Sequence, residues 1–322
     1  MSEERLELCL LIPIHDFNHY QKKMIESLKV QDSESFMVYF GFNGISREKF
    51  FDCEKSLSKL INKTFSFKSL YNETGDANLM RQILFEKSNS DIPYVMYLDS
   101  DDRLAKENSL SEIINLKKEH SPDILCLNIS TTDDSGETIY FKDRLEFKYG
   151  DKLLDKTKNT NQIIEDYRSN IVAKVINRHL LEGINFKSLP MFQDWNISGK
   201  LYDRFFSIYN STTVHYLYIH REDSVSNSFR REKLFKLAEC VKDINSNIQK
   251  SKYHSHLNIS FWLNFLSYSV KSNYYKPFFR EYRYFMKEIN PFKIISIKQF
   301  IKYFFIAIPV TGILYFKFFK DD

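Results

Sequence analysis

Short, nearly uninterrupted apolar runs alternate with segments of helical periodicity over the first 130 residues. The run at residues 8–14 is typical of a strand buried on both faces. Between the runs, apolar residues recur at helical spacing, as at Phe50, Cys53 and Leu57. Strands that alternate with helices predict βαβ units, and therefore an α/β fold with a mainly parallel sheet. The predicted strands are 8–14, 36–42, 64–70, 94–98 and 124–129, and the predicted helices are 19–28, 49–61, 77–87 and 108–119.

Beyond residue 130 the alternation ends and a helical pattern follows. From Arg230, apolar residues mark one helical face, from Leu234 through Val241 to Ile248. We therefore expect a catalytic domain at residues 1–227, followed by a helical C-terminal region at 228–322. The other predicted elements are a polar hairpin at 131–150 with its turn at Asp134-Ser135-Gly136, strands at 170–176 and 214–219, and aromatic-rich helices at 261–270 and 278–289.

Composition and charge narrow the class of protein. With 322 residues and 43% hydrophobic residues, the chain is neither disordered nor a disulfide-stapled miniprotein. Residues 228–322 hold 17 Lys/Arg against 7 Asp/Glu, although the net charge of the whole chain is only +4. A basic end on an acidic body predicts an anionic partner, either membrane or nucleic acid. Membrane is favoured, because the basic residues are mixed with large aromatic ones.

The cysteines and the start of the chain bear on its location. Cys9, Cys53, Cys126 and Cys240 are far apart and form no C-x-x-C pair, so we expect buried free thiols and no zinc site. The apolar run at 8–14 is too short for a signal peptide. These features predict a cytoplasmic protein, peripheral at the inner face of the cell membrane.

The C-terminal tail, residues 300–319, contains an uncharged stretch at 303–316, interrupted by Pro309 and Gly312 and flanked by lysines. This stretch is shorter than the roughly 20 residues that a membrane-spanning helix needs. A membrane-associating segment that lies in the interface is therefore favoured. A helix packed on the catalytic domain and a true single span are the alternatives.

A cluster of carboxylates follows the predicted strand at 94–98. Asp99, Asp101 and Asp102 stand at its carboxyl end, where open α/β sheets bind their ligands. Carboxylates this close repel one another unless a cation neutralises them, and Mg²⁺ or Mn²⁺ prefers oxygen ligands. The sequence thus predicts a metal site. The alternative is a solvated acidic loop that begins the next helix.

Six segments, in order, resemble those of family 2 glycosyltransferases with the GT-A fold. The resemblance covers roughly residues 8–227. Each motif is short, but their order along the chain makes the resemblance specific. The segments are Leu11-Ile12-Pro13-Ile14-His15-Asp16, Asn72-Glu73-Thr74-Gly75 followed by Arg81, Asp99-Ser100-Asp101-Asp102, residues 171–181, Gln193-Asp194-Trp195, and Arg221-Glu222-Asp223-Ser224-Val225-Ser226.

The resemblance implies an inverting hexosyltransferase of surface-polysaccharide (capsule) synthesis. Such an enzyme moves a sugar from a nucleotide-sugar donor, here a UDP-hexose, to a hydroxyl of a glycan or lipid-linked acceptor, and nucleic acid is not a partner. Asp194 would be the general base that takes the proton of the acceptor hydroxyl. Asp101, helped by Asp99 and Asp102, would hold Mn²⁺ or Mg²⁺ at the leaving diphosphate.

The resemblance also places the nucleotide. Pro13, at the end of the first strand, and Asp99 would lie beside it. Asn43 stands where the family often has an acidic residue that contacts the base, and its amide can hydrogen-bond a base edge. A second departure is Gln193, which replaces the family's glutamate before the base Asp194.

Several polar residues have both a functional and a structural interpretation. Arg81 and Arg221 are candidates for phosphate contacts, because a guanidinium binds phosphate through two hydrogen bonds, or they form ordinary ion pairs. Trp195 either stacks on an acceptor sugar or packs in the core. The pair Asp133-Asp134 is expected to be solvated in its turn.

Two other functions compete with sugar transfer. A phosphohydrolase of the haloacid dehalogenase type also places D-x-D after an apolar strand, but normally the first strand. It usually continues with Gly and Thr, where this chain has Asp102 and Arg103. A non-catalytic membrane adaptor would use the basic tail, but would leave Asp101 and Asp194 without a role.

Overall fold

The computed structural model describes residues 5–135, 137–138, 147–189, 192–221, 232–248, 252–271, 273–290, 292, 297–308 and 313. Contacts divide the chain into two compact units. Unit 1 comprises Met1–Ser188 and Arg204–Ser224, and unit 2 comprises Leu189–Asp203 and Val225–Asp322. The predicted division at residue 227 differs from this one mainly by residues 189–203, which belong with the C-terminal helices.

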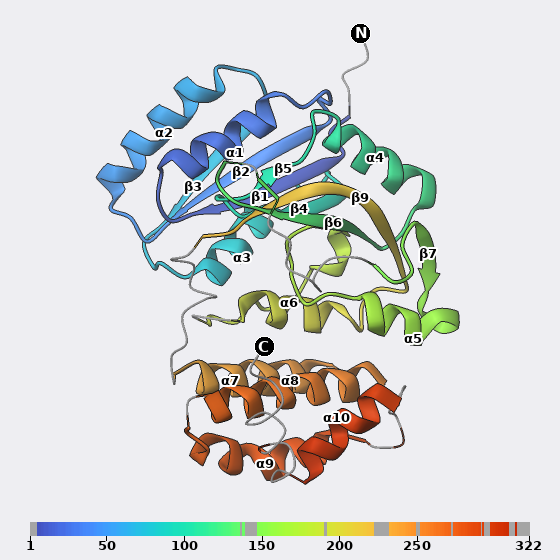
Figure 1. Cartoon of the computed structure of the whole chain (residues 1–322). Helices are drawn as coiled ribbons and strands as arrows, with labels where there is room; N and C mark the ends of the chain where they lie inside the picture. Colours follow the sequence, from blue (N-terminus) through green and yellow to red (C-terminus); the bar gives the residue numbers. More distant parts are fainter. Residues whose placement is uncertain are drawn as a thin grey trace. The chain divides into compact units, whose positions relative to one another are not determined.

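Unit 1 is built on a sheet of nine strands within the described residues (Figure 1). The first four neighbours, β3-β2-β1-β4, are all parallel, as predicted. β8 then runs antiparallel to β4 and to β6, so the second half of the sheet is mixed. The sheet order is β3-β2-β1-β4-β8-β6-β9-β5, with β7 paired to β9. The bounds are β1 Leu8–Ile14, β2 Phe36–Asn43, β3 Phe67–Asn72, β4 Tyr94–Tyr97, β5 Arg103–Leu104, β6 Ile124–Thr132, β7 Lys152–Asp155, β8 Lys174–Asn177 and β9 Ser207–Ile219.

The helices of unit 1 connect these strands and cover the sheet. α1 and α2 lie on one face of the sheet and α3 on the other (Figure 1). Asn18 and Gln21 close a capping box at the start of α1, and Asp76 caps α3. The predicted helices are therefore confirmed, whereas β7 and α5 were not predicted, because residues 152–166 are mostly polar. The bounds are α1 His19–Lys29, α2 Arg47–Ile61, α3 Ala77–Lys87, α4 Ser109–His120 and α5 Lys156–Asp166, with the 3₁₀ helix η1 Arg178–Leu180.

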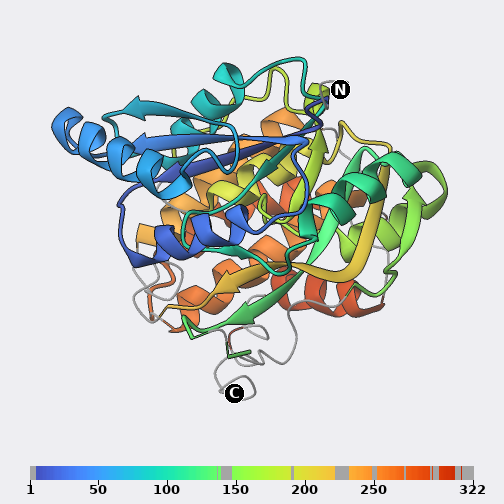
Figure 2. The ribbon, with the colours of Figure 1, turned by 90° about the horizontal axis from the view of Figure 1, so that it is seen from above.

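The core of unit 1 follows the apolar runs of the sequence. Every residue of β1 is buried, as a strand covered on both faces requires. Cys9, Cys53 and Cys126 of this unit are buried thiols outside any disulfide, as predicted, and Cys240 of unit 2 is buried as well. Viewed from above, the sheet twists between its blue parallel strands and the green and yellow β6 and β9 (Figure 2).

The predicted hairpin after β6 is present at its base. Thr132 pairs with Thr138, and the Asp133 N–H donates to the Glu137 carbonyl at 3.0 Å. Residue 136 of the predicted turn and residues 139–146 lie outside the described residues. Asp134, predicted to be solvated, is partly exposed and also pairs with two cations. Its carboxylate pairs with Arg103 at 2.7 Å and with Lys23 at 2.9 Å, because the turn packs over cations from β5 and α1.

Unit 2 is helical and has an aromatic core. Trp262 stacks on Phe278, with ring centroids 4.6 Å apart, and lies 4.4 Å from the ring of Phe285. The predicted apolar face from Leu234 to Ile248 is buried, which confirms it. The bounds are α6 Gln193–Leu201, α7 Glu232–Asn247, α8 Lys252–Lys271, α9 Lys276–Glu288 and α10 Ile297–Ala307.

Half of the predicted tail, residues 309–312 and 314–319, lies outside the described residues. Its first part, from Phe300, belongs to α10. Across the described ranges, none of the helices is both long and apolar enough to cross a membrane.

Candidate functional site

The carboxyl ends of β1, β2 and β4 lie side by side, since these strands are parallel neighbours. Pro13 pairs in register with Gly41 of β2, and Asn43 ends that strand. Asp99 follows β4 by two residues. The structure therefore brings the predicted residues Pro13, Asn43 and Asp99 to one edge of the sheet. The chain order alone did not require this, because it depends on the strand order.

Asn43 is fully buried beside His15. Its amide nitrogen lies 3.4 Å from the His15 Nε2 atom. Its carbonyl oxygen, Oδ1, is buried and has no hydrogen-bond partner among the described residues. A buried amide oxygen without a donor is costly, so this atom is suited to accept a hydrogen bond from a ligand.

Two glycines close the loops next to Asn43. Gly44 and Gly75 have φ values of +72° and +70°, which side chains rarely adopt. A Cβ atom at Gly44 would lie 2.8 Å from the Gly75 Cα atom. The Gly44 N–H donates to the Asn72 carbonyl at 3.1 Å, which joins the loop after β2 to the end of β3. Only glycine allows the two loops to approach this closely.

Arg81 and Asp99 form an ion pair at this edge. Arg81 projects from α3, is 5% exposed, and its Nη2 atom lies 2.8 Å from Asp99 Oδ1. Asn78 accepts from the Arg81 Nη1 atom at 3.4 Å, and Tyr97 donates to the Arg81 carbonyl at 3.3 Å. Arg81 thus forms a largely buried ion pair, and its partner is one of the predicted metal ligands.

A second predicted arginine pairs with a second aspartate. The Arg221 Nη2 atom lies 2.7 Å from Asp101 Oδ2, and both side chains are partly exposed. The guanidinium of Arg221 also lies over the ring of Tyr20, 5.2 Å from its centroid. Residues 222–226 of the late motif lie outside the described residues. At the sheet edge, two arginines therefore face two of the three clustered carboxylates.

Asp102, the third carboxylate, is buried and bonded within the protein. Tyr216 donates to its Oδ2 atom at 2.5 Å, and the Ile219 N–H donates to Oδ1 at 2.9 Å. Burial, and then the charges of Asp101 and Asp99, raise the pKa of the Asp102 carboxyl well above its usual range. Burial and the neighbouring carboxylates likewise raise the pKa of Tyr216. Both oxygens of Asp102 thus hold β9 against the end of β4.

Of the three carboxylates at this edge, only Asp99 and Asp101 could serve as ligands of a hard divalent cation. Among the described residues, no group of three His, Cys, Asp or Glu is arranged to hold a metal ion. Mg²⁺ and Mn²⁺ take one or two carboxylates together with substrate phosphates, so two carboxylate side chains fit the chemistry. Asp102 does not add a third, since its oxygens accept from Tyr216 and Ile219.

Asp194 belongs to unit 2, where it stands in the first turn of α6. α6 is fixed to α7 through Asp243, which accepts from Asn196 at 2.7 Å and pairs with Lys200 at 2.6 Å. Gly199 permits the contact, because a Cβ there would lie 2.9 Å from Ile244. The helix that carries Asp194 is therefore held rigidly to its own unit.

Trp195, next to Asp194, packs against the aromatic core of unit 2 together with Phe192. The core interpretation of Trp195 is the one that these contacts support.

Arg178 and Lys174, from the segment at residues 171–181, make hydrogen bonds that support the fold. The Arg178 Nε atom donates to the Ile92 carbonyl at 2.8 Å, and its Nη2 atom donates to Ser88 at 3.0 Å. Lys174 is buried and donates to the Arg168 carbonyl at 2.9 Å. These contacts lie within unit 1 and support β8 between its two antiparallel neighbours.

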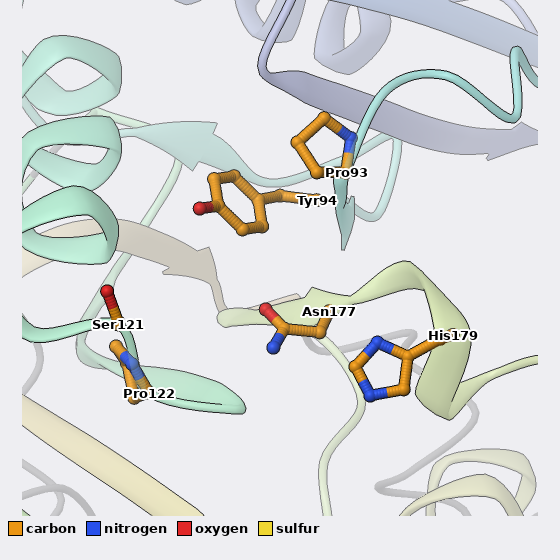
Figure 3. A pocket seen from close by; sticks show the side chains of 6 residues that line it. All are labelled: Pro93, Tyr94, Ser121, Pro122, Asn177 and His179. Atoms are coloured by element: carbon orange, nitrogen blue, oxygen red, sulfur yellow. The ribbon is translucent and has the colours of Figure 1, made fainter.

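A small pocket lies at the amino end of β4, opposite the end that carries Asp99 (Figure 3). Its volume of about 220 Å³ is below the usual range for ligand sites. The buried Lys117 lies beside it and donates to the Pro122 carbonyl at 2.5 Å and to Asn177 at 2.7 Å. The pocket shares no residue with the predicted site. Its lining residues are Pro93, Tyr94, Ser121, Pro122, Asn177 and His179.

Sequence reasoning missed Tyr216 and the role of His15. Tyr216 lies inside a long strand that contains two other tyrosines, and nothing in that pattern separates it from an ordinary core tyrosine. His15 follows Ile14 directly, and the end of a strand at the ligand-binding edge was a signal that could have identified it.

Comparisons with known proteins identify the fold. No protein-family model matches the chain, and no curated protein sequence matches it significantly. The crystal structure of S. aureus TarS 1–349 in complex with UDP-GlcNAc is similar over 97% of this chain and 90% of that chain, with a TM-score of 0.68 and 16% identity. A longer TarS structure gives a TM-score of 0.65 and 15% identity, and this chain covers 55% of it, about half its length.

A mannosyltransferase, PcManGT from Pyrobaculum calidifontis, in complex with GDP-Man and Mn²⁺, is similar over 99% of this chain and 89% of that chain. Its TM-score is 0.56 and its identity 7%. At such identities the similarities establish the fold alone, and they confirm the predicted α/β fold of the GT-A type.

Proposed function

We propose that this protein is a glycosyltransferase that moves a sugar from a nucleotide-sugar donor to an acceptor hydroxyl. One observation carries the proposal. Asp99 and Asp101, each paired with an arginine, stand at the carboxyl end of β4 in a fold shared with proteins solved with UDP-GlcNAc and GDP-Man. This edge of an α/β sheet is where a charged ligand is expected.

The donor would bind along this edge. The buried Asn43 oxygen would accept a hydrogen bond from the base, and Pro13 and the paired loops of Gly44 and Gly75 lie at the same edge. Uracil carries an N–H donor that this oxygen can bind, as guanine does too, and in our proposal the donor is a UDP-hexose. Arg81 and Arg221 supply positive charge near the diphosphate.

A divalent cation, Mn²⁺ or Mg²⁺, would be held by Asp101 with Asp99. When bound, it would supply Lewis-acid stabilisation of the leaving diphosphate. In this proposal Asp102 is a positioning residue, because Tyr216 and Ile219 bond both of its oxygens. Arg81 holds the Asp99 carboxylate in place from α3.

Asp194 is our proposed general base. Asp194 stands in the first turn of α6, where the helix dipole favours the unprotonated form that a general base needs before it can accept a proton. Attack by the acceptor hydroxyl opposite the leaving diphosphate would invert the anomeric centre. The acceptor in this proposal is a glycan or lipid-linked glycan of surface-polysaccharide synthesis, used at the inner face of the membrane.

The test is a panel of nucleotide sugars with Mn²⁺, measured by thermal shift and by release of nucleoside diphosphate. The true donor should raise the melting temperature and should be consumed when the acceptor is present. The proposed donor is a UDP-sugar, and GDP-sugars belong in the panel as the comparison because guanine also carries N–H donors. Binding of no nucleotide sugar, or formation of an aspartyl phosphate from a phosphorylated substrate, would contradict the proposal.

A further inference from the structure

The outer face of α9 carries a row of basic side chains. Lys276, Arg280, Arg283 and Lys287 are all exposed, and their spacing of four, three and four residues places them on one face of the helix. The opposite face is buried through Phe278 and Phe285. We call these four residues the basic stripe.

α10 carries an exposed apolar face. Phe300, Ile301, Phe304 and Ile308 are 57%, 50%, 45% and 44% exposed. Their spacing again marks one side of a helix, with Ile308 one residue beyond its end. A single exposed apolar residue is ordinary, but a row of four is unusual for a surface that faces only water. We call these residues the apolar stripe.

The two stripes belong to neighbouring helices of unit 2. α9 and α10 both pack against α8, and the Tyr282 hydroxyl donates to the Ala307 carbonyl at 2.9 Å. Tyr282 and Ala307 lie outside both stripes, on the flanks of their helices. The contact therefore joins the two helices side by side and leaves both stripes exposed. In Figure 1, α9 and α10 form the lower layer of this unit, beneath α7 and α8.

The charge of the basic stripe is cancelled only in part within α9, where Arg280 pairs with Glu281. α9 contains two acidic residues, Glu281 in its middle and Glu288 at its end. Glu281 is only 6% exposed. Its carboxylate pairs with Lys242 at 2.5 Å and with Arg280 at 3.0 Å. The buried glutamate thus anchors α9 to α7, while the basic stripe faces outwards.

We propose that the basic stripe and the apolar stripe together form a docking surface for an anionic lipid bilayer. The basic side chains would contact headgroup phosphates, and the apolar side chains would enter the boundary between headgroups and acyl chains. Nucleic acid would explain the basic stripe but would leave the apolar stripe in water. The proposal uses the two stripes on α9 and α10 rather than the far tail, and it does not depend on the transferase activity.

The test is flotation of the full-length protein with vesicles of phosphatidylcholine, with and without phosphatidylserine. A variant with Lys276, Arg280, Arg283 and Lys287 all changed to Gln should partition roughly 10²–10³-fold more weakly into the anionic vesicles, because each basic residue near such a surface contributes roughly fivefold. The matched control changes the exposed Arg47, Lys55, Lys59 and Lys63 of the α2 region in unit 1 to Gln, and it should float like wild type.

A second variant tests the apolar stripe. Phe300→Ser with Phe304→Ser should weaken flotation even in 0.5 M NaCl, where screening removes most of the charge contribution. Circular dichroism and thermal unfolding establish that each variant is folded. Should the four-residue variant unfold, the pair Lys276→Gln with Lys287→Gln should still give a graded loss.

Three results would overturn the proposal. These are flotation of the folded basic-stripe variant equal to wild type, equal flotation with and without phosphatidylserine, and binding of an oligonucleotide without binding of vesicles.

Discussion

The Tyr216 hydroxyl donates a hydrogen bond of 2.5 Å to the buried carboxylate of Asp102, and it accepts one from the Asp99 N–H at 3.3 Å. One hydroxyl of β9 therefore holds both ends of the turn at residues 99–102. The Asp102 N–H closes the same turn by donating to the Asp99 carbonyl at 3.0 Å. Asp102 in turn holds Ile219, two residues before Arg221. The carboxylates of this turn are thus positioned by β9, a strand more than 100 residues later in the sequence.

Removing this hydroxyl should loosen the turn. Tyr216→Phe leaves a buried carboxylate oxygen and the Asp99 N–H without their partner, so we expect a loss of about 2 kcal/mol in the free energy of unfolding. We also expect weaker binding of UDP with Mn²⁺, measured by calorimetry on the folded variant. The control is Tyr209→Phe on the same strand, where the ring stacks on His120. If the two variants bind UDP equally well, Tyr216 does not position the site.

Asp101 should be needed for metal-dependent binding. Asp101→Asn removes a charged oxygen ligand, so Mn²⁺ should no longer strengthen the binding of UDP. A chelator should therefore weaken UDP binding by wild type but not by the variant. Asp134→Asn is the matched control, because Asp134 also pairs with an arginine at 2.7 Å. Binding of Mn²⁺ by the Asp101 variant at wild-type affinity, measured by electron paramagnetic resonance, would disprove the metal role.

Asp194 should matter for transfer but not for donor binding. Asp194→Asn is nearly isosteric but cannot accept the proton of the acceptor hydroxyl, so turnover should fall about 10²–10⁴-fold while the thermal shift by the donor is kept. Asp203→Asn, just beyond the end of α6, is the control in the same unit. Normal turnover by the Asp194 variant with the true acceptor would assign the base to another residue.

Glycine should be required at position 44 both for its positive φ and for the close contact with Gly75. Gly44→Ala and Gly183→Ala both place alanine at a φ near +70°, which costs roughly 1–2 kcal/mol in each case. At Gly44 the new Cβ also meets Gly75, whereas at Gly183 no atom of the described chain lies within 4 Å. Urea unfolding should therefore show the larger loss for Gly44→Ala, and only this variant should bind UDP more weakly. Equal effects of both substitutions would exclude the loop contact.

His215 should make the fold sensitive to acid. Burial lowers the pKa of His215 to about 4, and neither ring nitrogen has a hydrogen-bond partner among the described residues. Between its unfolded pKa of about 6.5 and the folded value, the unfolded chain binds a proton that the folded chain does not. Stability should therefore fall as the pH drops through this window, by about 3 kcal/mol at most.

The measurement is the free energy of unfolding in urea from pH 7.5 to pH 4, for wild type and for His215→Leu. The free energy of unfolding of wild type minus that of the variant should fall steadily as the pH drops below 6.5. Parallel pH profiles would show that His215 does not cause the loss.

Local pattern alone predicted the first half of the fold. A run such as Leu8–Ile14 has no polar position to face water, so it must lie in a sheet covered on both faces. Helix starts were also local, because a cap such as Asp76 bonds an N–H three residues away. The acidic cluster at residues 99–102 could be placed at the ligand edge for the same reason, since it directly follows β4.

Contacts between distant segments could not be predicted in this way. The insertion of β8 between β4 and β6 is set by pairing of strands far apart in sequence, and β7 and α5 take their burial from β9 rather than from their own pattern. Periodicity reports which face of a segment is apolar, but not which segment covers it.

The same distinction between local sequence and long-range contacts applies to the charged residues at the sheet edge. The sequence by itself determined that three carboxylates follow β4 and that arginines lie at positions 81 and 221. Only the tertiary structure decided that Arg81 pairs with Asp99, that Arg221 pairs with Asp101, and that Tyr216 bonds Asp102. Residue type fixes the charge that a side chain carries, whereas its partner depends on the packing of β9 and α3 around β4. Desolvation by that packing then makes Asp102 a buried support, and Asp99 and Asp101 remain partly exposed at the edge.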